Sequence, residues 1–590
     1  MLKPIALIIT CLLSSSALTI DGWFNCSAST LSTTNVRGIA LSPFVECALV
    51  LLPLCHPKIC SDTDNRQVEV FVKRIQSQSN DAQVIQDLWV LQGGPGASSL
   101  AMETMMFDMF ELLNRQVNIY TMDHRGTGRS NPLECIASQA TTPGSPGGVV
   151  IEFSEIPACV DDILFHIGGH TSAFSVTSAA LDLKALLEEF GTPKNHEVYV
   201  YGASYGTLLV ERLMQLEPTI VKGYTLDGVI SQSGSNYFRH SFANWDHDVS
   251  VVGWRFLDRC MHDSYCHSQI PYNLTSLLRV VYDRVDKGNV YPGALPALKG
   301  RPPSHYLRIF LAKMLLNWNT RRLLPALIYR LWRASPTDYQ VLLHIQSTML
   351  DWHIAGITDS TKGFSMMLYY LIVFSEEWIY PTPTYADLKT EFEQGLFGDG
   401  VHAYVPYYCA LTQNQDAACK DLQPKLNSSK FTYSHDEYWN RTTVIPPNAS
   451  VLLLTGEFDA QTEGHYAVAE LHNLIGTKKR LISFLDATHC AAFSTPMLHD
   501  RGHCGVHVIA SYIKANGDLD GISLACMNDM QPLSFLIEPT FSIQYFGTED
   551  AYGNAINSEP VLLKAPKLGE HLTHSLGATI LVIIGVILCV

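Results

Sequence analysis

The sequence has few positively charged residues and contains no basic run. Lysine and arginine together number 40 against 56 aspartate and glutamate residues, which gives a formal net charge of -16. Proteins that bind nucleic acid or anionic surfaces concentrate lysine and arginine on one face. We therefore expect no nucleic-acid partner. The 590 residues are 47% hydrophobic and 16% charged, an ordinary composition for a packed globular protein.

The sequence also lacks the paired C-x-x-C spacing of a structural zinc site, and we expect no metal and no cofactor. Of the 15 cysteines, Cys11 and Cys589 lie in the two terminal hydrophobic segments. The remainder is an odd number, so one thiol is left over if the others pair in an oxidising compartment. The close pairs that we expect to be bridged are Cys260/Cys266 and Cys409/Cys419.

Both ends of the chain carry apolar segments. Residues 1–17 have the order of a secretory signal peptide, with Lys3 before an apolar run and small residues. Residues 576–590 are uncharged and lack a basic flank, which favours a removable glycolipid-anchor signal over a short transmembrane or buried helix. We expect a secreted protein, lipid-anchored at the extracellular face of the plasma membrane. Five glycosylation sequons fit this route, at Asn25, Asn273, Asn427, Asn440 and Asn448.

Short apolar runs separated by helical stretches predict a mostly parallel central sheet with helices on both faces. An alternating segment at 67–75 predicts an early antiparallel strand. Between 232 and 440 the runs give way to helical segments rich in Trp, Tyr and Leu, and we call this inserted segment the cap. The sheet domain is then split into 40–231 and 441–515, and an extension without recognisable pattern covers 516–575. The expected parallel strands are 87–91, 117–122, 198–201, 224–226, 451–455 and 479–485, and the expected helices are 178–190, 207–216, 306–316, 323–332 and 505–514.

The strongest functional motif is GASYG at 202–206, which follows the apolar run 198–201 and precedes an expected helix. A G-x-S-x-G sequence between a strand and a helix is typical of a nucleophile elbow, in which small residues allow the strained turn that exposes the serine. The helix N-terminus behind the serine also favours developing negative charge. We predict that Ser204 is the nucleophile.

A nucleophilic serine needs a base, normally a histidine that a carboxylate orients. Downstream, the strand at 451–455 leads into a turn with Asp459, and the strand at 479–485 leads into a loop with His489. The order Ser, acid, His is that of the α/β-hydrolase fold. We predict Asp459 as the acid and His489 as the base, with Glu457 and Asp486 as competing carboxylates.

Acyl transfer also needs donors for the tetrahedral oxyanion. One is usually the amide after the nucleophile, here Tyr205, and the other comes from a loop after an early strand. The loop 92–96 (QGGPG) follows such a strand, and its glycines allow close approach of the backbone to a substrate. We predict Gly93, Gly94 and Tyr205 as the oxyanion residues.

These motifs resemble those of the prolyl aminopeptidase and tripeptidyl aminopeptidase branch of α/β-hydrolase serine peptidases. Two departures are Gln92, where prolyl aminopeptidases usually have histidine, and the absence of proline after Thr462. The matching segments occur in the family's order in both halves of the expected core: QGGPG at 92–96, MDHRGTGRS at 122–130, GASYG at 202–206, LDGV at 226–229, LTGEFDAQT at 454–462 and DATHC at 486–490.

The resemblance also implies how a substrate is held, because similar enzymes bind the free amino terminus with carboxylates from the cap. Glu376 and Glu377 in VFSEEW are the local candidates, since an ammonium in an apolar cleft needs a paired charge. The alternative is a solvated helix end. Asp123 and Arg125 either shape the site or brace the loop after a strand.

The sequence as a whole predicts a serine exopeptidase of the aminopeptidase type, which releases N-terminal residues or short peptides from peptides with a free amino terminus through an acyl-enzyme. An esterase or lipase with the same triad is the alternative, because acyl transfer is common to both. A non-catalytic adhesion protein would be expected to have lost a triad member. An epoxide or haloalkane hydrolase would carry aspartate in place of Ser204.

Overall fold

The computed structural model describes residues 18–30, 45–78, 84–135, 151–191, 196–291, 295, 301–360, 363–500 and 502–553, with the backbone alone described at 350–360. The expected signal peptide (1–17) and anchor signal (576–590) lie outside these ranges. Among the described residues, no helix combines the length and apolar character needed to cross a membrane.

The core of the molecule is a nine-stranded sheet of order β1-β2-β3-β5-β4-β6-β7-β8-β9. β1, β2, β3 and β5 pair antiparallel, whereas β4 through β9 pair parallel. The predicted mostly parallel sheet is thus confirmed, as is the early antiparallel strand at 67–75. The strands are β1 Thr19–Asn25, β2 Val45–Pro53, β3 Gln67–Ile75, β4 Ile85–Leu91, β5 Asn118–Met122, β6 His196–Ala203, β7 Val221–Asp227, β8 Ser450–Gly456 and β9 Lys479–Phe484.

Helices cover both faces of the sheet, as predicted. Successive strand residues point to opposite faces. On β4, Leu88 and Val90 pack in the cluster that contains α1 and α16, while Trp89 and Leu91 pack in the cluster that contains α3 and α4. The helices of the sheet domain are α1 Glu103–Leu112, α2 Ile156–His166, α3 Val176–Gly191, α4 Tyr205–Gln215, α14 Gly464–Asn473, α15 Ala491–Ser494 and α16 Cys504–Lys514.

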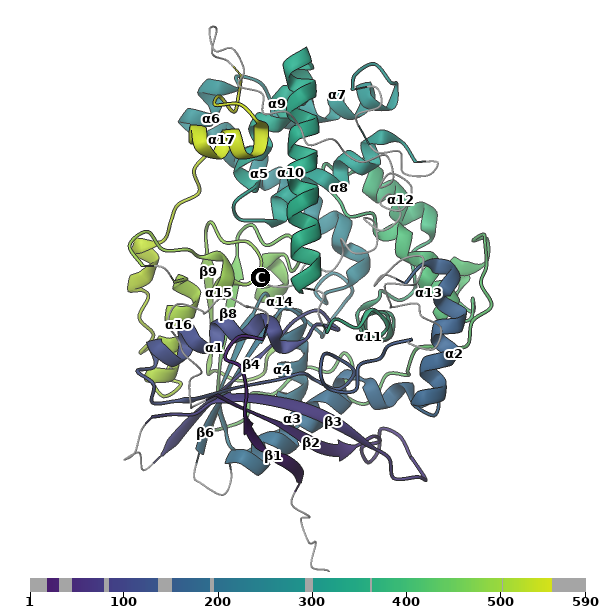
Figure 1. Ribbon diagram of the computed structural model, residues 1–590, viewed down its shortest axis with the longest axis vertical. Helices are drawn as coiled ribbons and strands as arrows, with labels where there is room; N and C mark the ends of the chain where they lie inside the picture. Colours follow the sequence, from purple (N-terminus) through teal and green to yellow (C-terminus); the bar gives the residue numbers. More distant parts are fainter. Residues whose placement is uncertain are drawn as a thin grey trace, which may run out of the picture.

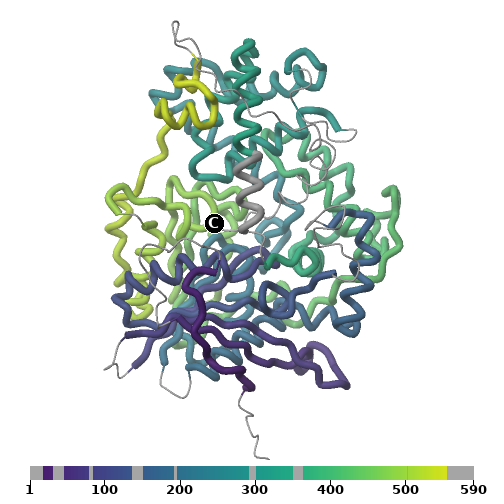
Figure 2. The backbone as a smooth tube through the Cα atoms, viewed as in Figure 1, coloured from purple at the N-terminus to yellow at the C-terminus, as the bar shows by residue number. Residues whose placement is uncertain are grey.

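The described part of the cap between β7 and β8 is helical and contains no named strand. Its helices rise above the carboxyl edge of the sheet (Figures 1 and 2). The cap thus covers the edge where side chains after parallel strands meet. Its helices are α5 Trp245–His262, α6 Ser264–Gln269, α7 Leu274–Asp286, α8 Pro303–Leu316, α9 Leu324–Arg333, α10 Pro336–Ser360, α11 Met366–Ile372, α12 Tyr385–Gln394 and α13 Val405–Leu411, with a π-helical turn at Val373–Glu377.

The segment after α16 returns to the cap, which its sequence did not indicate. In Figure 2 the yellow end of the described chain runs from the sheet domain up to the cap. Its helix α17 (Pro539–Phe546) contacts α10. Arg330 donates to the carbonyl of Ala551, Arg333 donates to that of Gly553, and both guanidiniums pair with Asp338. The described part of the extension therefore packs against the cap.

The described residues include six disulfides and the asparagines of all five sequons. The bridges expected at Cys260/Cys266 and Cys409/Cys419 are present. Further disulfides join Cys26–Cys47, Cys55–Cys60, Cys135–Cys159 and Cys504–Cys526. The asparagines of the five sequons are all exposed.

Candidate active site

Ser204 lies at the turn between β6 and α4. Its backbone has φ 55° and ψ -123°, a conformation that L-residues rarely adopt and that a nucleophile elbow requires. The Ser204 N–H donates to the carbonyl of Asp227 at 2.8 Å, which holds the turn against the end of β7. The serine is therefore fixed at the carboxyl edge of the sheet, with α4 beginning directly behind it.

The glycines around Ser204 are required by close packing. A Cβ on Gly202 would lie 2.3 Å from the carbonyl oxygen of Gly206, and a Cβ on Gly206 would lie 2.9 Å from that of Gln92. A Cβ on Gly93 would approach the Cβ of Ser204 to 2.8 Å. Because real side chains do not tolerate such contacts, the elbow and the loop 92–96 can pack together only with glycine at these positions.

Asp459 and His489 form a buried pair. His489 Nδ1 lies 2.8 Å and 2.9 Å from the two carboxylate oxygens of Asp459. The carboxylate also accepts the backbone N–H groups of Gln461 and Thr462 and the Thr462 hydroxyl. These bonds fix the carboxylate and keep the proton of His489 on Nδ1, so Nε2 is left as the basic atom. Neither Glu457 nor Asp486 hydrogen-bonds to His489.

His489 Nε2 is buried and has no hydrogen-bond partner, and no hydrogen bond joins it to the hydroxyl of Ser204. Ser204 follows β6 and His489 follows β9, and both strands end at the same edge of the parallel sheet, since β6 pairs with β7, β7 with β8 and β8 with β9. Hydrogen bonds between a nucleophile and its base are often long without substrate and tighten in the complex. The structure thus contains a hydrogen-bonded Asp459–His489 pair and a serine that is not hydrogen-bonded to it.

Two of the predicted oxyanion residues, Tyr205 and Gly93, differ in whether their backbone N–H group already has an acceptor. The N–H of Tyr205 is the first amide of α4 and points out of the helix end, where it has no intrahelical acceptor. The N–H of Gly93 instead donates to the side-chain oxygen of Gln92 at 2.9 Å. Gln92 would have to release this bond before Gly93 could donate to an oxyanion.

Glu376 and Glu377 are both buried, at 6% and 4% exposure, in the π-helical turn after α11. They are therefore not a solvated helix end. Glu376 is occupied, because it pairs with Arg212 at 2.8 Å and accepts the hydroxyl of Tyr433 at 3.0 Å. Glu377 has one carboxyl oxygen without a partner, and the other lies 3.8 Å from Nδ1 of His240. Burial, together with the charge of Glu376, raises the pKa of Glu377 to about 8.

Two groups missed by the sequence analysis complete this region. The hydroxyl of Tyr205, the residue after the nucleophile, is buried without a hydrogen-bond partner, and burial, with the charges of Glu376 and Glu377, raises its pKa. His240 Nδ1 is likewise unpartnered, and burial lowers the pKa of this histidine to about 4. The sequence predicted Tyr205 only for its backbone N–H, and no motif marked its hydroxyl or His240. They are found only because the fold brings the loop after β7 and the cap to the elbow.

Asp123 and Arg125 brace the loop after β5. Asp123 accepts the Ser99 backbone N–H and hydroxyl and pairs with Arg129. Arg125 is fully buried, pairs with Asp182 at 2.5 Å and donates to the carbonyl of Leu54. Their groups are saturated by these contacts, which favours the bracing interpretation.

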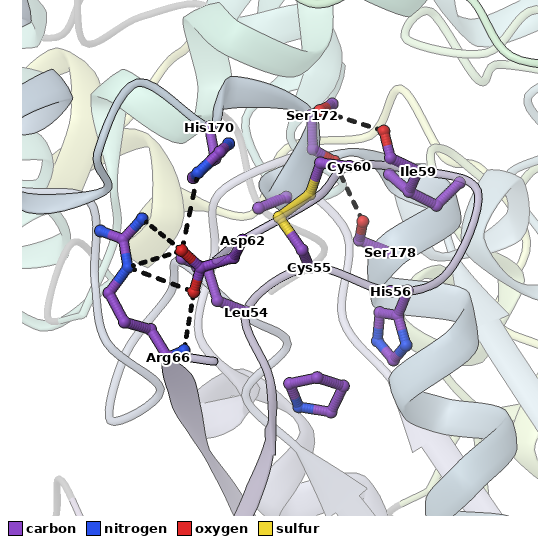
Figure 3. The surroundings of a disulfide bond; sticks show 12 residues. Leu54, Cys55, His56, Ile59, Cys60, Asp62, Arg66, His170, Ser172 and Ser178 are labelled. Atoms are coloured by element: carbon purple, nitrogen blue, oxygen red, sulfur yellow. Dashed lines mark hydrogen bonds and ion pairs between the residues drawn. A yellow bond between two sulfur atoms is a disulfide. The ribbon is translucent and has the colours of Figure 1, made fainter. Parts of the chain in front are cut away.

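Among the described residues, one group has the spacing of metal ligands: Cys55, Cys60 and His170. Figure 3 shows that the two sulfurs are joined as a disulfide. Neither is a thiolate that could coordinate a metal. Asp62 lies on the other side of His170, 3.8 Å from its Nε2, and makes a closer ion pair with Arg66 (Figure 3).

A buried carboxyl pair lies behind the nucleophile helix. Glu211 on α4 and Glu470 on α14 are fully buried, and Glu211 accepts the hydroxyl of Thr443 at 2.7 Å. Burial raises the pKa of both carboxyls, and their mutual repulsion adds to the effect on Glu470. The pair therefore holds a proton to a higher pH than exposed glutamates do.

This pair predicts a pH-dependent stability. A carboxyl whose pKa is raised in the folded state contributes stability below its unfolded pKa, near 4.5, and this contribution is lost as the pH rises through the folded pKa. Glu470→Gln removes the ionisation and keeps a polar side chain. We expect the melting temperature of the variant relative to wild type to increase from pH 5 to pH 8. The control is the half-exposed Glu188→Gln, and a difference that does not change with pH would contradict the prediction.

Comparison with known proteins agrees with this topology. The family model described as alpha/beta hydrolase fold matches residues 88–260. The chain has the α/β-hydrolase fold, with a mostly parallel sheet, surrounding helices and a helical insertion. No curated protein matches the sequence.

Similar solved structures include hydrolases of several kinds. A proline iminopeptidase from Mycobacterium smegmatis is 10% identical, with 76% of this chain and 96% of that chain covered and a TM-score of 0.33. An esterase from Exiguobacterium antarcticum is 12% identical, with 72% and 89% covered and a TM-score of 0.27. Mouse alpha/beta hydrolase domain-containing protein 10 is 9% identical, with 79% and 97% covered and a TM-score of 0.28. These likenesses do not separate a peptidase from an esterase.

Proposed function

We propose that this protein is a serine hydrolase that removes N-terminal residues or short peptides from peptide substrates. The observation that carries the proposal is a strained serine elbow next to a buried Asp459–His489 pair whose outer nitrogen is unpartnered. This combination is what general-base activation of a serine needs. No cofactor or metal enters the proposed chemistry.

In the proposed reaction, His489 Nε2 takes the proton of Ser204 as the hydroxyl oxygen attacks the scissile carbonyl. The positive charge that forms on His489 is stabilised by the buried carboxylate of Asp459. The N–H of Tyr205, with Gly94 or a released Gly93, donates to the oxyanion. His489 then protonates the leaving amine, and water cleaves the acyl-enzyme by the same steps.

Glu377 is the group that favours a peptide with a free amino terminus. It is buried, one of its carboxyl oxygens has no partner, and it directly follows Glu376, which pairs with Arg212 on α4, the helix that begins after the nucleophile. A substrate ammonium would supply the missing positive charge. Glu376 would contribute indirectly, because its carboxylate is paired with Arg212 and its charge acts on Glu377.

Replacing Glu377 tests the proposed amine site. We expect Glu377→Gln to raise KM for free-amino peptides about 30-fold, because loss of a buried charge pair costs about 2 kcal/mol. Hydrolysis of an activated ester without an amino group should keep its wild-type kcat/KM. The matched control is Glu457→Gln, a carboxylate beside the acid turn that does not touch His489. An equal loss on both substrates would contradict the proposed role.

The same carboxyl predicts the pH dependence of binding. Since the pKa of Glu377 is raised to about 8, the carboxylate that binds an ammonium becomes more populated as the pH rises to 8. Above this pH the substrate's own α-amino group, with a pKa of about 8, loses its charge. The ratio of kcat/KM for a free-amino peptide to that for the ester should therefore peak near pH 8. In Glu377→Gln the rise below pH 8 should disappear.

A carboxylic ester hydrolase is the alternative function, because the same triad performs both reactions. Hydrolysis of esters together with no serine-dependent cleavage of any peptide would support it. A non-catalytic adhesion role would instead require that the protein show no Ser204-dependent reaction. Labelling with a fluorophosphonate, which phosphonylates activated serines, separates this case: wild-type protein should be labelled and Ser204→Ala should not.

We also propose that the protein is secreted and held at the outer face of the plasma membrane through its C-terminus. The disulfides support an oxidising compartment. The exposure of Asn25, Asn273, Asn427, Asn440 and Asn448 supports their glycosylation. Digestion with an N-glycosidase should reduce the apparent mass of the protein made in a secreting cell, and an unchanged mass would contradict this part of the proposal.

A further inference from the structure

Asp227, the last residue of β7, is a buried carboxyl that the proposed chemistry does not use. It is fully shielded from solvent. Its two carboxyl oxygens accept the backbone N–H of Ala491 at 2.7 Å and that of Ala492 at 2.9 Å. The hydroxyl of Tyr201 donates to the same carboxyl at 2.9 Å. The donors to this carboxyl group thus lie on the neighbouring strand β6 and in the segment directly after His489.

The backbone of Asp227 contacts the other half of the site. Its carbonyl accepts the N–H of Ser204 at 2.8 Å, within the strained turn of the elbow. One residue thus binds the nucleophile turn through its backbone and the base loop through its side chain. Ser204 and His489 are not directly hydrogen-bonded to each other, and Asp227 provides a hydrogen-bonded link between the two segments.

Gly228, the next residue, lies against the imidazole ring of His489. Its φ is +68°, and a Cβ built on it would lie 2.8 Å from Cε1 of His489, 3.1 Å from Nδ1 and 3.0 Å from the sulfur of Cys490. Nδ1 of the same ring is held by the carboxylate of Asp459. A side chain at position 228 would therefore have to displace the ring from Asp459 or move the loop.

We propose that Asp227 and Gly228 are positioning residues that set the distance between His489 and Ser204. Asp227 fixes the backbone after His489 to the end of β7, and Gly228 leaves room for the ring beside it. The inference rests on the proposed function, because it assigns these residues to the placement of its base and nucleophile. Neither residue contacts the reacting atoms.

The proposal predicts a loss of turnover without a loss of binding. In Asp227→Asn, the amide NH2 replaces one oxygen and faces a backbone N–H, so one of the two bonds to the loop is lost. In Gly228→Ala, the methyl group meets the ring. We expect kcat on an activated ester to fall at least about 100-fold in each, since a displacement near 1 Å at a reacting group costs this much. KM should change less than about threefold.

Two control variants separate positioning from general destabilisation. Gly288 has φ +69° and open space around its Cβ, so Gly288→Ala carries the same backbone strain without touching a ring. Asp87 is buried at the opposite end of the sheet and accepts from Asn118, so Asp87→Asn removes a comparable carboxylate. Both controls should lower the melting temperature and leave kcat within about threefold of wild type.

The measurement is kcat and KM for all four variants, together with the rate of fluorophosphonate labelling and the melting temperature. If Asp227→Asn does not fold, Tyr201→Phe replaces it in the test, because it removes one hydrogen bond to Asp227 and no charge. We expect Tyr201→Phe to lower kcat several-fold and to leave KM unchanged. Wild-type kcat in Tyr201→Phe and Gly228→Ala, with Ser204 still essential, would overturn this inference alone. Wild-type protein that fails to react through Ser204 would overturn the proposed function as well.

Discussion

Ser204→Ala is expected to lower kcat for every substrate of this protein by about a million-fold, to the level of the uncatalysed reaction plus binding effects. The hydroxyl of Ser204 is the atom that attacks in the proposed reaction, and no other serine occupies a strained turn at the end of a described strand. Alanine fits the same backbone, because the Cβ of Ser204 already has its place beside Gly93. The melting temperature should stay within a few degrees of wild type.

The control for this variant is Ser235→Ala, an exposed serine on the loop after β7. It should keep full activity and full labelling by a fluorophosphonate. Residual activity of more than about one per cent in purified Ser204→Ala would contradict the assignment of the nucleophile. A loss of the folded state in Ser204→Ala is not expected, since the hydroxyl makes no hydrogen bond that the fold needs.

Asp459→Asn is expected to lower kcat about 10,000-fold near neutral pH. The carboxylate accepts the proton on Nδ1 of His489 and leaves Nε2 basic. An asparagine there either offers its NH2 group to Nδ1, which turns the histidine into the wrong tautomer, or loses its bonds to Gln461 and Thr462. In the first case Nε2 carries the proton and cannot accept that of Ser204, and in the second the side chain that orients the ring is no longer fixed by the turn.

The two competing carboxylates provide the controls for this prediction. Glu457→Gln and Asp486→Asn change charges in the same two loops without touching His489, and both should keep kcat within about tenfold of wild type. KM for ester substrates should be unchanged in all three variants. A kcat loss that is larger in Asp486→Asn than in Asp459→Asn would assign the acid to the other loop.

The sequence predicted those strands whose burial is reflected in a short local pattern of apolar residues. The apolar runs correspond to β4 through β9, and the alternating segment at 67–75 is β3, because period-two alternation and buried runs directly reflect sheet burial. β1 and β2 were not predicted. β1 is mostly exposed, and Val45–Pro53 carries an apolar stretch that alternation does not distinguish. The packing of the extension on the cap was also missed, because its contacts, such as that of Arg330 with Ala551, join residues more than 200 positions apart.

The residues of the candidate site likewise include some that the sequence could predict and some that it could not. Ser204, Asp459 and His489 each follow a strand, so the strand-turn pattern is enough to single them out. The difference between Glu376 and Glu377 could not be predicted, because it is set by Arg212 and Tyr433, which reach Glu376 from α4 and from the end of the cap. Asp227 belongs to a recognised motif, but its bonds to the segment after His489 become visible only when β7, β8 and β9 are paired in the sheet.

The most direct test of the proposed function is mass-spectrometric product analysis of a peptide library, with each peptide free and N-acetylated at its amino terminus. The library is incubated with purified wild-type protein and with Ser204→Ala. We expect N-terminal residues or short fragments to be released from the free peptides alone and only by the wild type. No serine-dependent cleavage of any peptide, or equal cleavage of acetylated peptides, would contradict the aminopeptidase function.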